Sequence, residues 1–368
     1  MSDNNTEPRL ASPGQVADEL QKLKKVDKNK MLDNAFQMPE HILLGIEAAR
    51  GFDEGDPPLD RSKIHMVGLG GSAIAGELLN DMLAPQQLIS LYGGTNPPRD
   101  KRGVIVSSYS GNTREVLELA HRVTGGLRTV VFLTSNGELA RLGEEWAVPV
   151  WRIPTGYQPR ATVGWSLSLS LSLMERWRVI SGALKKLNRA AGRLKVSLES
   201  TDLNEHILAQ AALPIAEAVK DKHTVIFHSL RCTGAARRLA AQLNENAKQP
   251  ACIQQVPEAM HNAVQGIAGA SPDAWALIFM SDSNNDTPTL RTSMLRTQQF
   301  FTDLGFSCLP YPAAGDDEFE VTLSRLFLAD LTSLLLAGLK GIDPTPIDVI
   351  TDLKEVEEEG VKQGSKPE

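Results

Sequence analysis

Short apolar segments that alternate with helical patterns constrain the fold of this chain more than any other feature of its sequence. Ile64–Val67 precedes a glycine-rich turn, and a helical pattern follows over Ala73–Met82. Because continuous apolar strands separated by helices are buried on both faces, this alternation predicts a parallel sheet covered by helices. Further strands are expected at Leu88–Tyr92, Val104–Ser107, Thr129–Leu133 and Val148–Arg152, with a helix over Asn112–Val123.

The second half of the chain repeats this pattern. The loop Ser281–Thr287 (SDSNNDT) corresponds to Ser107–Thr113 (SSYSGNT), and both follow a predicted strand. The sequence therefore predicts an α/β protein built from two copies of one unit. In the second copy, strands are expected at Thr224–His228, Cys252–Gln255, Ala276–Met280 and Ser307–Pro310, and helices at Gly234–Asn246, Asp286–Leu304 and Phe319–Leu339.

The segment Trp165–Trp177 gives conflicting signals. Its SLSLSLSL run alternates with period two, as a strand does, but the run is long and continues into a helical pattern. We expect a buried helix here, with a contact between subunits as one explanation of its burial. Helices are also expected at Gly14–Lys24 and Pro39–Arg50, after a frayed leader over residues 1–12.

Composition narrows the class of protein. The net charge of −7 disfavours a nucleic-acid partner, which needs clustered cations. The three cysteines, Cys232, Cys252 and Cys308, form no CxxC pair, so we expect reduced thiols and neither a disulfide framework nor a zinc site. No apolar run reaches membrane-spanning length and the first residues are polar, so we expect a cytoplasmic protein with no membrane partner.

Two small-residue loops offer anion sites at the ends of neighbouring strands. Gly70, Gly71 and Ser72 lie between a strand and a helix, where free amides and the helix dipole favour an anion. In the loop Ser107–Thr113, the hydroxyls of Ser108, Ser110 and Thr113 lie at the start of another helix. Each loop also has a purely structural explanation, a tight turn and a helix cap respectively. Because ligands gather at the carboxyl ends of parallel strands, we favour a phosphate site.

The first loop also satisfies a dinucleotide fingerprint, through Gly68, Gly70 and Ala73. That fingerprint requires a carboxylate near the end of the second strand, and the segment there reads LISLYGGTN. A nucleotide-dependent oxidoreductase is therefore a minor alternative, and we expect no cofactor.

Glu245 lies in the segment NENAK, sixteen residues before His261 across a predicted strand. Such a carboxylate and imidazole can serve as an acid/base pair. Taken singly, Glu245 could be a solvated helix-end carboxylate and His261 a helix-cap or core histidine. No HExxH or similar spacing indicates a metal site.

The segments GLGGSAIAGELL, SYSGNT, YQPRAT, NENAKQPA with MHN, and GIDPTPIDVITDLK together resemble the bifunctional phosphoglucose/phosphomannose isomerases of the sugar-isomerase (SIS) superfamily. The resemblance implies two SIS subdomains, each with a flavodoxin-like five-stranded parallel sheet flanked by helices. It also implies a homodimer with the active site at the subunit interface. The implied boundaries are an N-terminal helical segment (1–50), SIS subdomain 1 (51–185), SIS subdomain 2 (186–342), and a C-terminal helix and tail (343–368).

The resemblance also implies roles for individual residues. Glu245 would be the proton-shuttling base, and Arg160 would lie over C1 and C2 of the substrate. His261, from the partner subunit, would open the sugar ring, with Lys354 assisting. Arg160 could otherwise be a surface cation, and Lys354 part of a solvated face. The sugar phosphate would be bound by Gly71, Ser72, Ser108, Ser110 and Thr113.

The function so implied is metal-free interconversion of glucose 6-phosphate, and of mannose 6-phosphate, with fructose 6-phosphate. The alternative is a sugar-phosphate-binding SIS regulator without catalysis, because a fold does not fix a function. The sequence departs from the family pattern at GGSA, at PRAT and after His261. Thr345 and Ile347 compete for the position associated with accepting the mannose epimer, which leaves the epimer preference open.

Overall fold

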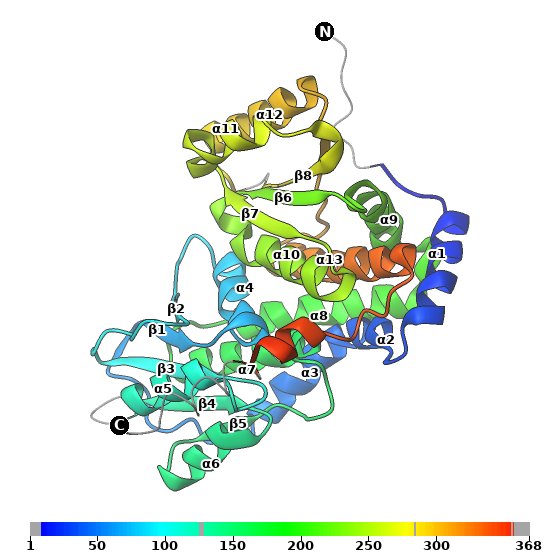
Figure 1. Ribbon diagram of the computed structural model, residues 1–368. Coiled ribbons are helices and arrows are strands. Elements are labelled where there is room, and N and C mark those ends of the chain that lie inside the picture. The colour runs from blue at the N-terminus through cyan, green and yellow to red at the C-terminus, as the bar shows by residue number, and fades with distance from the viewer. Residues whose placement is uncertain (1–8, 125–128, 283–284, 355, 357–368) are drawn as a thin grey trace, which may run out of the picture.

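The first half of the chain forms a five-stranded parallel sheet. A computed structural model describes residues 9–124, 129–282, 285–354 and 356 (Figure 1). The strand order is β2-β1-β3-β4-β5, as expected for a flavodoxin-like unit. The sequence-based expectation of five buried parallel strands is confirmed for this half. The strands are β1 (Asp60–Val67), β2 (Ile89–Tyr92), β3 (Arg102–Ser107), β4 (Val130–Thr134) and β5 (Val150–Arg152).

The second sheet has four strands in the described residues, in the order β7-β6-β8-β9, so the expectation of five strands is wrong here. After β9, the next apolar segment forms the 23-residue helix α13 (Glu318–Lys340) instead of a strand, and the chain does not return to the edge of the sheet. The strands are β6 (His223–His228), β7 (Ala251–Gln255), β8 (Trp275–Met280) and β9 (Ser307–Pro310), all parallel.

A layer of helices lies between the two sheets (Figure 1). α4 (Ile74–Met82), which follows β1, packs against α10 (Thr233–Ala247), which follows β6. α13 packs against α10 and α9 (Ile207–Val219). The outer faces are covered by α5 (Arg114–Val123) and α6 (Gly137–Glu145) on the first sheet, and by α11 (Ala263–Ala268) and α12 (Pro288–Asp303) on the second.

α7 (Val163–Arg176) confirms that the serine-leucine repeat is helical. Period two fails as a strand signal because serine hydroxyls bond back to the helix itself: Ser168 Oγ donates to Gly164 O and Ser172 Oγ to Ser168 O. The helix is buried by neighbours from its own chain, so its burial needs no partner subunit. Those neighbours include α3 (Met38–Ala49) and α8 (Ala183–Ser200), and α1 (Pro13–Val26) and α2 (Met31–Phe36) complete the N-terminal helices.

The described residues also contain short 3-10 helices and a helical segment over residues 348–354. η1 (Gly70–Ser72), η2 (Pro159–Thr162) and η5 (Glu258–His261) carry residues singled out above, and the others are η3 (Leu203–Glu205), η4 (Leu230–Cys232) and η6 (Pro272–Ala274). One described helix, α13, is long and apolar enough to cross a membrane by length and composition. Since 94% of its most apolar window is buried inside the protein, we interpret it as a core helix.

Candidate active site

The two small-residue loops meet at the carboxyl ends of β1 and β3. The backbone N–H of Tyr109 donates to Ser72 Oγ over 3.0 Å, and Ser108 Oγ lies 3.0 Å from Thr113 Oγ1. β1 and β3 are neighbours at the point where the strand order reverses, which is where α/β sheets bind ligands. The structure therefore brings Ser72, Ser108 and Thr113 into one cradle, as the sequence suggested.

Gly111 is required by the shape of this cradle. Its φ is +69°, and a Cβ there would lie 1.9 Å from the carbonyl oxygen of Asn136. The neighbouring Ser110 is exposed, and its hydroxyl accepts a hydrogen bond from the backbone N–H of Asn112. The loop is thus folded tightly between β3 and α5, with Ser110 at its outer side.

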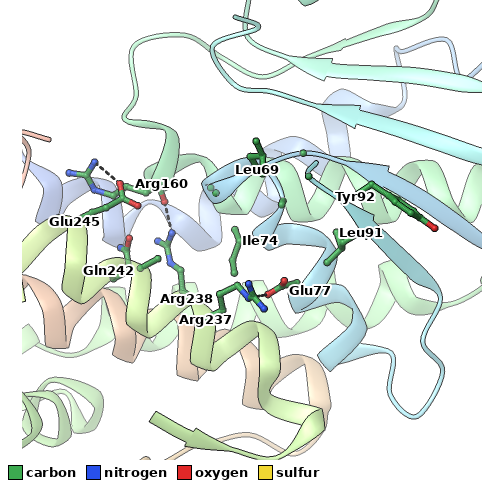
Figure 2. Close-up of a pocket in the computed structure, with 16 residues that line it drawn as sticks. Leu69, Ile74, Glu77, Leu91, Tyr92, Arg160, Arg237, Arg238, Gln242 and Glu245 are labelled. Carbon is green, nitrogen blue, oxygen red and sulfur yellow. Dashed lines mark hydrogen bonds and ion pairs between the residues drawn. The ribbon is translucent and has the colours of Figure 1, made fainter. Parts of the chain in front are cut away.

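A cavity of about 290 Å³ separates the glycine loop from α10 (Figure 2). One wall is the glycine loop with the start of α4, and the opposite wall is one face of α10. Arg160 and Glu245 stand together at one end, where Gly71 also approaches the backbone of Arg160. The α10 face presents Arg237, Arg238, Ala241, Gln242 and Glu245 to the cavity.

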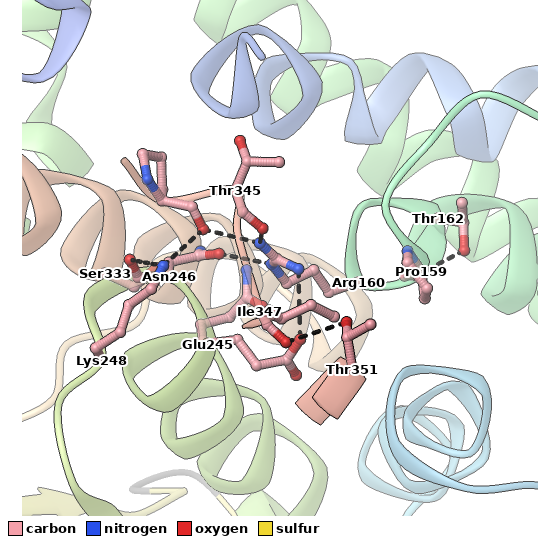
Figure 3. Close-up of polar contacts among 12 residues, drawn as sticks. Pro159, Arg160, Thr162, Glu245, Asn246, Lys248, Ser333, Thr345, Ile347 and Thr351 are labelled. Carbon is pink, nitrogen blue, oxygen red and sulfur yellow. Dashed lines mark hydrogen bonds and ion pairs between the residues drawn. The ribbon is translucent and has the colours of Figure 1, made fainter. Parts of the chain in front are cut away.

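Arg160 is held in a fixed orientation beside Glu245 (Figure 3). Its Nη1 donates to Glu245 Oε2 over 3.4 Å. Nε donates to Asn246 Oδ1 over 2.7 Å, and Nη2 donates to the carbonyl oxygens of Pro344 and Thr345 over 2.8 and 2.9 Å. The Arg160 side chain is 2% exposed, whereas that of Glu245 is 26% exposed. Glu245 is thus the more exposed member of the pair, and both residues line the cavity.

The electrostatics of this pair follow from its burial. Burial lowers the pKa of the Arg160 guanidinium, and the Glu245 carboxylate opposes that shift. The result is a positive group that remains desolvated next to a reachable carboxylate. Such an arrangement can remove a proton from a bound molecule and stabilise the negative charge that develops on its oxygen.

Lys248 and the segment after α13 are functional candidates that we did not predict from the sequence. Lys248 Nζ donates to the carbonyl oxygen of Asp343 over 2.9 Å, so Lys248 and Arg160 both bind main-chain oxygens of residues 343–345. Burial lowers the pKa of Lys248, as does the nearby Arg160 charge. The only feature of the sequence that pointed to Lys248 was its position within the segment NENAK.

His261 does not lie beside Glu245 within one chain. Glu245 is near the end of α10, at the edge of the second sheet where β7 begins, whereas η5 with His261 follows the carboxyl end of β7. The five residues of β7 separate these edges by about 17 Å. His261 is exposed and, among the described residues, is not part of the cavity wall.

Lys354 is exposed on helical residues 348–354 and does not line the cavity. Within the described residues, no group of three or more His, Cys, Asp or Glu side chains could hold a metal ion. β2 ends at Tyr92 and is followed by Gly93, where a dinucleotide site would need a carboxylate for the ribose.

Comparison with known proteins bears on the fold and the family of this chain. Residues 209–356 match the family model described as the bacterial phospho-glucose isomerase C-terminal SIS domain. A hypothetical protein from Thermus thermophilus superposes with a TM-score of 0.72 over 96% of this chain and 100% of that protein, at 15% identity. This second likeness shows the fold alone, and with the family model it confirms the SIS architecture.

Two relatives of known name extend the comparison. A D-glucosamine-6-phosphate 4-epimerase from Sulfolobus acidocaldarius is 26% identical over 298 residues, covering 80% of this chain and 88% of the relative. A bifunctional phosphoglucose/phosphomannose isomerase from Aquifex aeolicus is 30% identical over 301 residues, covering 79% of this chain and 89% of the relative. The chain therefore belongs to the bifunctional phosphoglucose/phosphomannose isomerase family.

Proposed function

We propose that this enzyme interconverts glucose 6-phosphate, and mannose 6-phosphate, with fructose 6-phosphate. The observation that carries the proposal is the Arg160–Glu245 pair at the end of a cavity whose other wall is the glycine loop. A carboxylate that is partly exposed and paired with a buried guanidinium suits proton transfer next to a carbonyl group.

The reaction moves a proton between two neighbouring carbons of the open-chain sugar. In the aldose-to-ketose direction, Glu245 takes the proton from C2, exchanges it with solvent protons, and delivers a proton to C1, while a proton moves from O2 to O1. The intermediate is an enediol or enediolate. The Nη1 group of Arg160 stabilises the negative charge on its oxygens. The carboxylate and the guanidinium supply the acid/base and electrostatic parts of this mechanism without a metal ion.

The cradle of Ser72, Ser108 and Thr113, together with Gly71 and Ser110, would bind the phosphate group. Amides, hydroxyls and the N-terminus of a helix are suited to a phosphate dianion. Because the phosphate does not react, its binding energy serves to position C1 and C2 against Glu245.

Ring opening requires a second acid/base group. We assign this role to His261 of the partner subunit, with help from Lys354, in a homodimer whose active sites lie at the subunit interface. The exposure of His261, and its place at the opposite edge of the second sheet from Glu245, are consistent with a role on a neighbouring subunit.

The direct test is turnover by Glu245→Gln, assayed with glucose and mannose 6-phosphates in the presence of a chelator. We expect the turnover number to fall by about a thousandfold while sugar-phosphate binding persists. Glu217→Gln is the matched control, since Glu217 stands at the same distance from the end of α9 as Glu245 from the end of α10. Near-normal turnover by Glu245→Gln would remove the mechanism.

The same wild-type and variant proteins distinguish the proposed function from two alternatives. A regulator without catalysis would bind fructose 6-phosphate with no exchange of its C1 or C2 protons with solvent. The relative named D-glucosamine-6-phosphate 4-epimerase makes inversion at C4 the other alternative. Nuclear magnetic resonance spectra of the products distinguish a C4 epimer from a C1–C2 isomer.

A further inference from the structure

Asn246 lies between the Arg160 guanidinium and the core helix α13. It directly follows Glu245 in the chain and is fully buried, with 0% of its surface exposed. Its Oδ1 accepts from Arg160 Nε over 2.7 Å, and its Nδ2 donates to Ser333 Oγ over 3.0 Å. Neither group of the Asn246 amide is free, so this side chain connects the proposed active site to the protein core (Figure 3).

The direction of every hydrogen bond in this connection is determined. A guanidinium can only donate, so the amide oxygen of Asn246 must face Arg160 and the amide nitrogen must face Ser333. Ser333 Oγ then accepts from Asn246, and its own proton goes to the carbonyl oxygen of Asp330 over 2.9 Å. The chain of donors therefore has one possible orientation, which fixes the plane of the Asn246 amide.

A second connection returns from α13 to the backbone of Arg160. The Asp330 carboxylate accepts from Arg238 Nη2 over 2.7 Å, and Arg238 Nη1 donates to the carbonyl oxygen of Arg160 over 2.8 Å. Gln242 also donates to Asp330, over 2.6 Å. Asn246 thus binds the side chain of Arg160, and Arg238 binds its main chain. Both contacts connect Arg160 to the same turn of α13.

These hydrogen bonds determine which N–H groups of Arg160 remain available to a substrate. A guanidinium has five N–H donors. Asn246 takes the one on Nε, and the carbonyl oxygens of Pro344 and Thr345 take those on Nη2. Only Nη1 faces Glu245 and can serve a substrate.

We propose that Asn246 is a positioning residue, which directs Nη1 of Arg160 toward Glu245 and the reacting oxygens of the substrate. The inference rests on the isomerase function proposed above. It assigns different roles to two residues that are adjacent in the chain: Glu245 carries the proton, and Asn246 orients the group that stabilises the resulting charge.

The test is Asn246→Asp, which preserves the shape of the side chain but removes the donor to Ser333 and adds a negative charge next to Arg160. The new carboxylate competes with Glu245 for the guanidinium. We expect kcat to fall by about 10- to 100-fold with KM changed less than about threefold, and the acidic limb of the kcat–pH profile to move to higher pH. Unchanged kcat and an unchanged pH profile would overturn the proposal.

Two further variants make the result interpretable. Ser333→Ala removes the second hydrogen bond without introducing a charge and keeps α13 helical, so it tests the proposal even if Asn246→Asp folds poorly. We expect its kcat to fall about threefold or more at an unchanged KM, and wild-type kcat would count against the proposal. Asn244→Asp is the matched control: Asn244 is exposed on the same helix and bonds Ala240 and Ala251 rather than Arg160. Loss of stability in Asn246→Asp and Ser333→Ala, with kcat unchanged in both, would leave Asn246 a purely structural role and overturn the proposal.

The failure of this inference and that of the proposed function are distinguishable. If the wild-type enzyme does not isomerise sugar phosphates, the proposed function fails. If the wild type is active, Glu245→Gln is inactive and Asn246→Asp is as active as wild type, only the positioning role is wrong.

Discussion

The carboxyl group of Asp81, on α4, accepts a hydrogen bond from the backbone N–H of Ala235, on α10, over 2.9 Å. The backbone N–H of Gly234 also donates to it. A residue from the first half of the chain therefore caps the helix that carries Glu245, and α4 directly follows the glycine loop. The cap fixes the position of the proposed phosphate cradle relative to the proposed base.

The buried carboxyl group of Asp81 should make the stability of the protein depend on pH. Burial raises the pKa of Asp81 to about 8, against the opposing effects of the two amides and of Arg325 on α13, and Glu77 raises it further. Because the folded protein holds this proton more tightly than the unfolded chain, the free energy of unfolding falls as pH rises from about 4 to about 8. Asp81→Asn removes this titration.

We therefore expect the stability of Asp81→Asn, relative to wild type, to improve by more than about 1 kcal/mol between pH 5 and pH 8.5. Urea denaturation at a series of pH values measures this difference. A difference between the two proteins that is constant with pH would contradict the assignment.

The close approach of Gly234 to α4 gives a second prediction about the contact between α4 and α10. A Cβ at this position would lie 2.6 Å from backbone atoms of Glu77 and Leu78, so the two helices approach more closely than any side chain allows. We expect Gly234→Ala to reduce stability by about 1–3 kcal/mol and to raise KM, because α4 and α10 must separate. Gly192→Ala on α8 is the control: nothing lies within 4 Å of that Cβ, and alanine there should stabilise the helix by about 0.5–1 kcal/mol.

Much of the fold could be predicted from the sequence because local patterns determine it. The apolar strands, the glycine loop and Ser107–Thr113 all lie where the alternation of patterns placed them. The expectation of a fifth strand in the second sheet was wrong because it came from the family resemblance, whereas the local sequence pattern of this half predicted only the four strands that are observed. No strand-forming segment follows β9 in the described residues, and the chain continues into α13 instead.

The proposed site was only partly predictable. Arg160 and Glu245 were identified through their motifs, and they meet in the structure. The contacts of Arg160 with residues 344–345, and those of Asn246 with Ser333, could not be predicted, because they join segments that are distant in sequence and leave no periodic signal. The role of His261 stays a prediction, since it depends on the arrangement of two subunits.

Arg160 should not tolerate lysine. An ammonium group has three donors on one atom and cannot reach Asn246, Glu245 and the two carbonyl oxygens together. We expect Arg160→Lys to reduce kcat by at least about 100-fold, measured in a coupled assay with glucose 6-phosphate. Arg152→Lys is the control, since Arg152 is half-buried on β5 and bonds Glu144 and Ser135. An Arg160→Lys enzyme as active as this control would exclude a role for the guanidinium.

Thr113 should affect binding rather than chemistry. Thr113→Val keeps the shape of the side chain but removes the hydroxyl that pairs with Ser108 in the cradle. We expect KM for the sugar phosphate to rise about tenfold with kcat nearly unchanged, because a phosphate contact acts in the ground state and in the transition state alike. Thr292→Val, on the exposed side of α12, is the control. A fall in kcat at constant KM would argue against a phosphate-binding role.

Hydrogen exchange with solvent tests the central claim, that Glu245 carries the proton between C1 and C2. Fructose 6-phosphate is incubated with the enzyme in heavy water, and deuterium at C1 and C2 of the sugar phosphates is followed by nuclear magnetic resonance. We predict that the wild type incorporates deuterium at these carbons and that Glu245→Gln does not. Isomerisation by the wild type without any incorporation, or undiminished incorporation by Glu245→Gln, would contradict the claim.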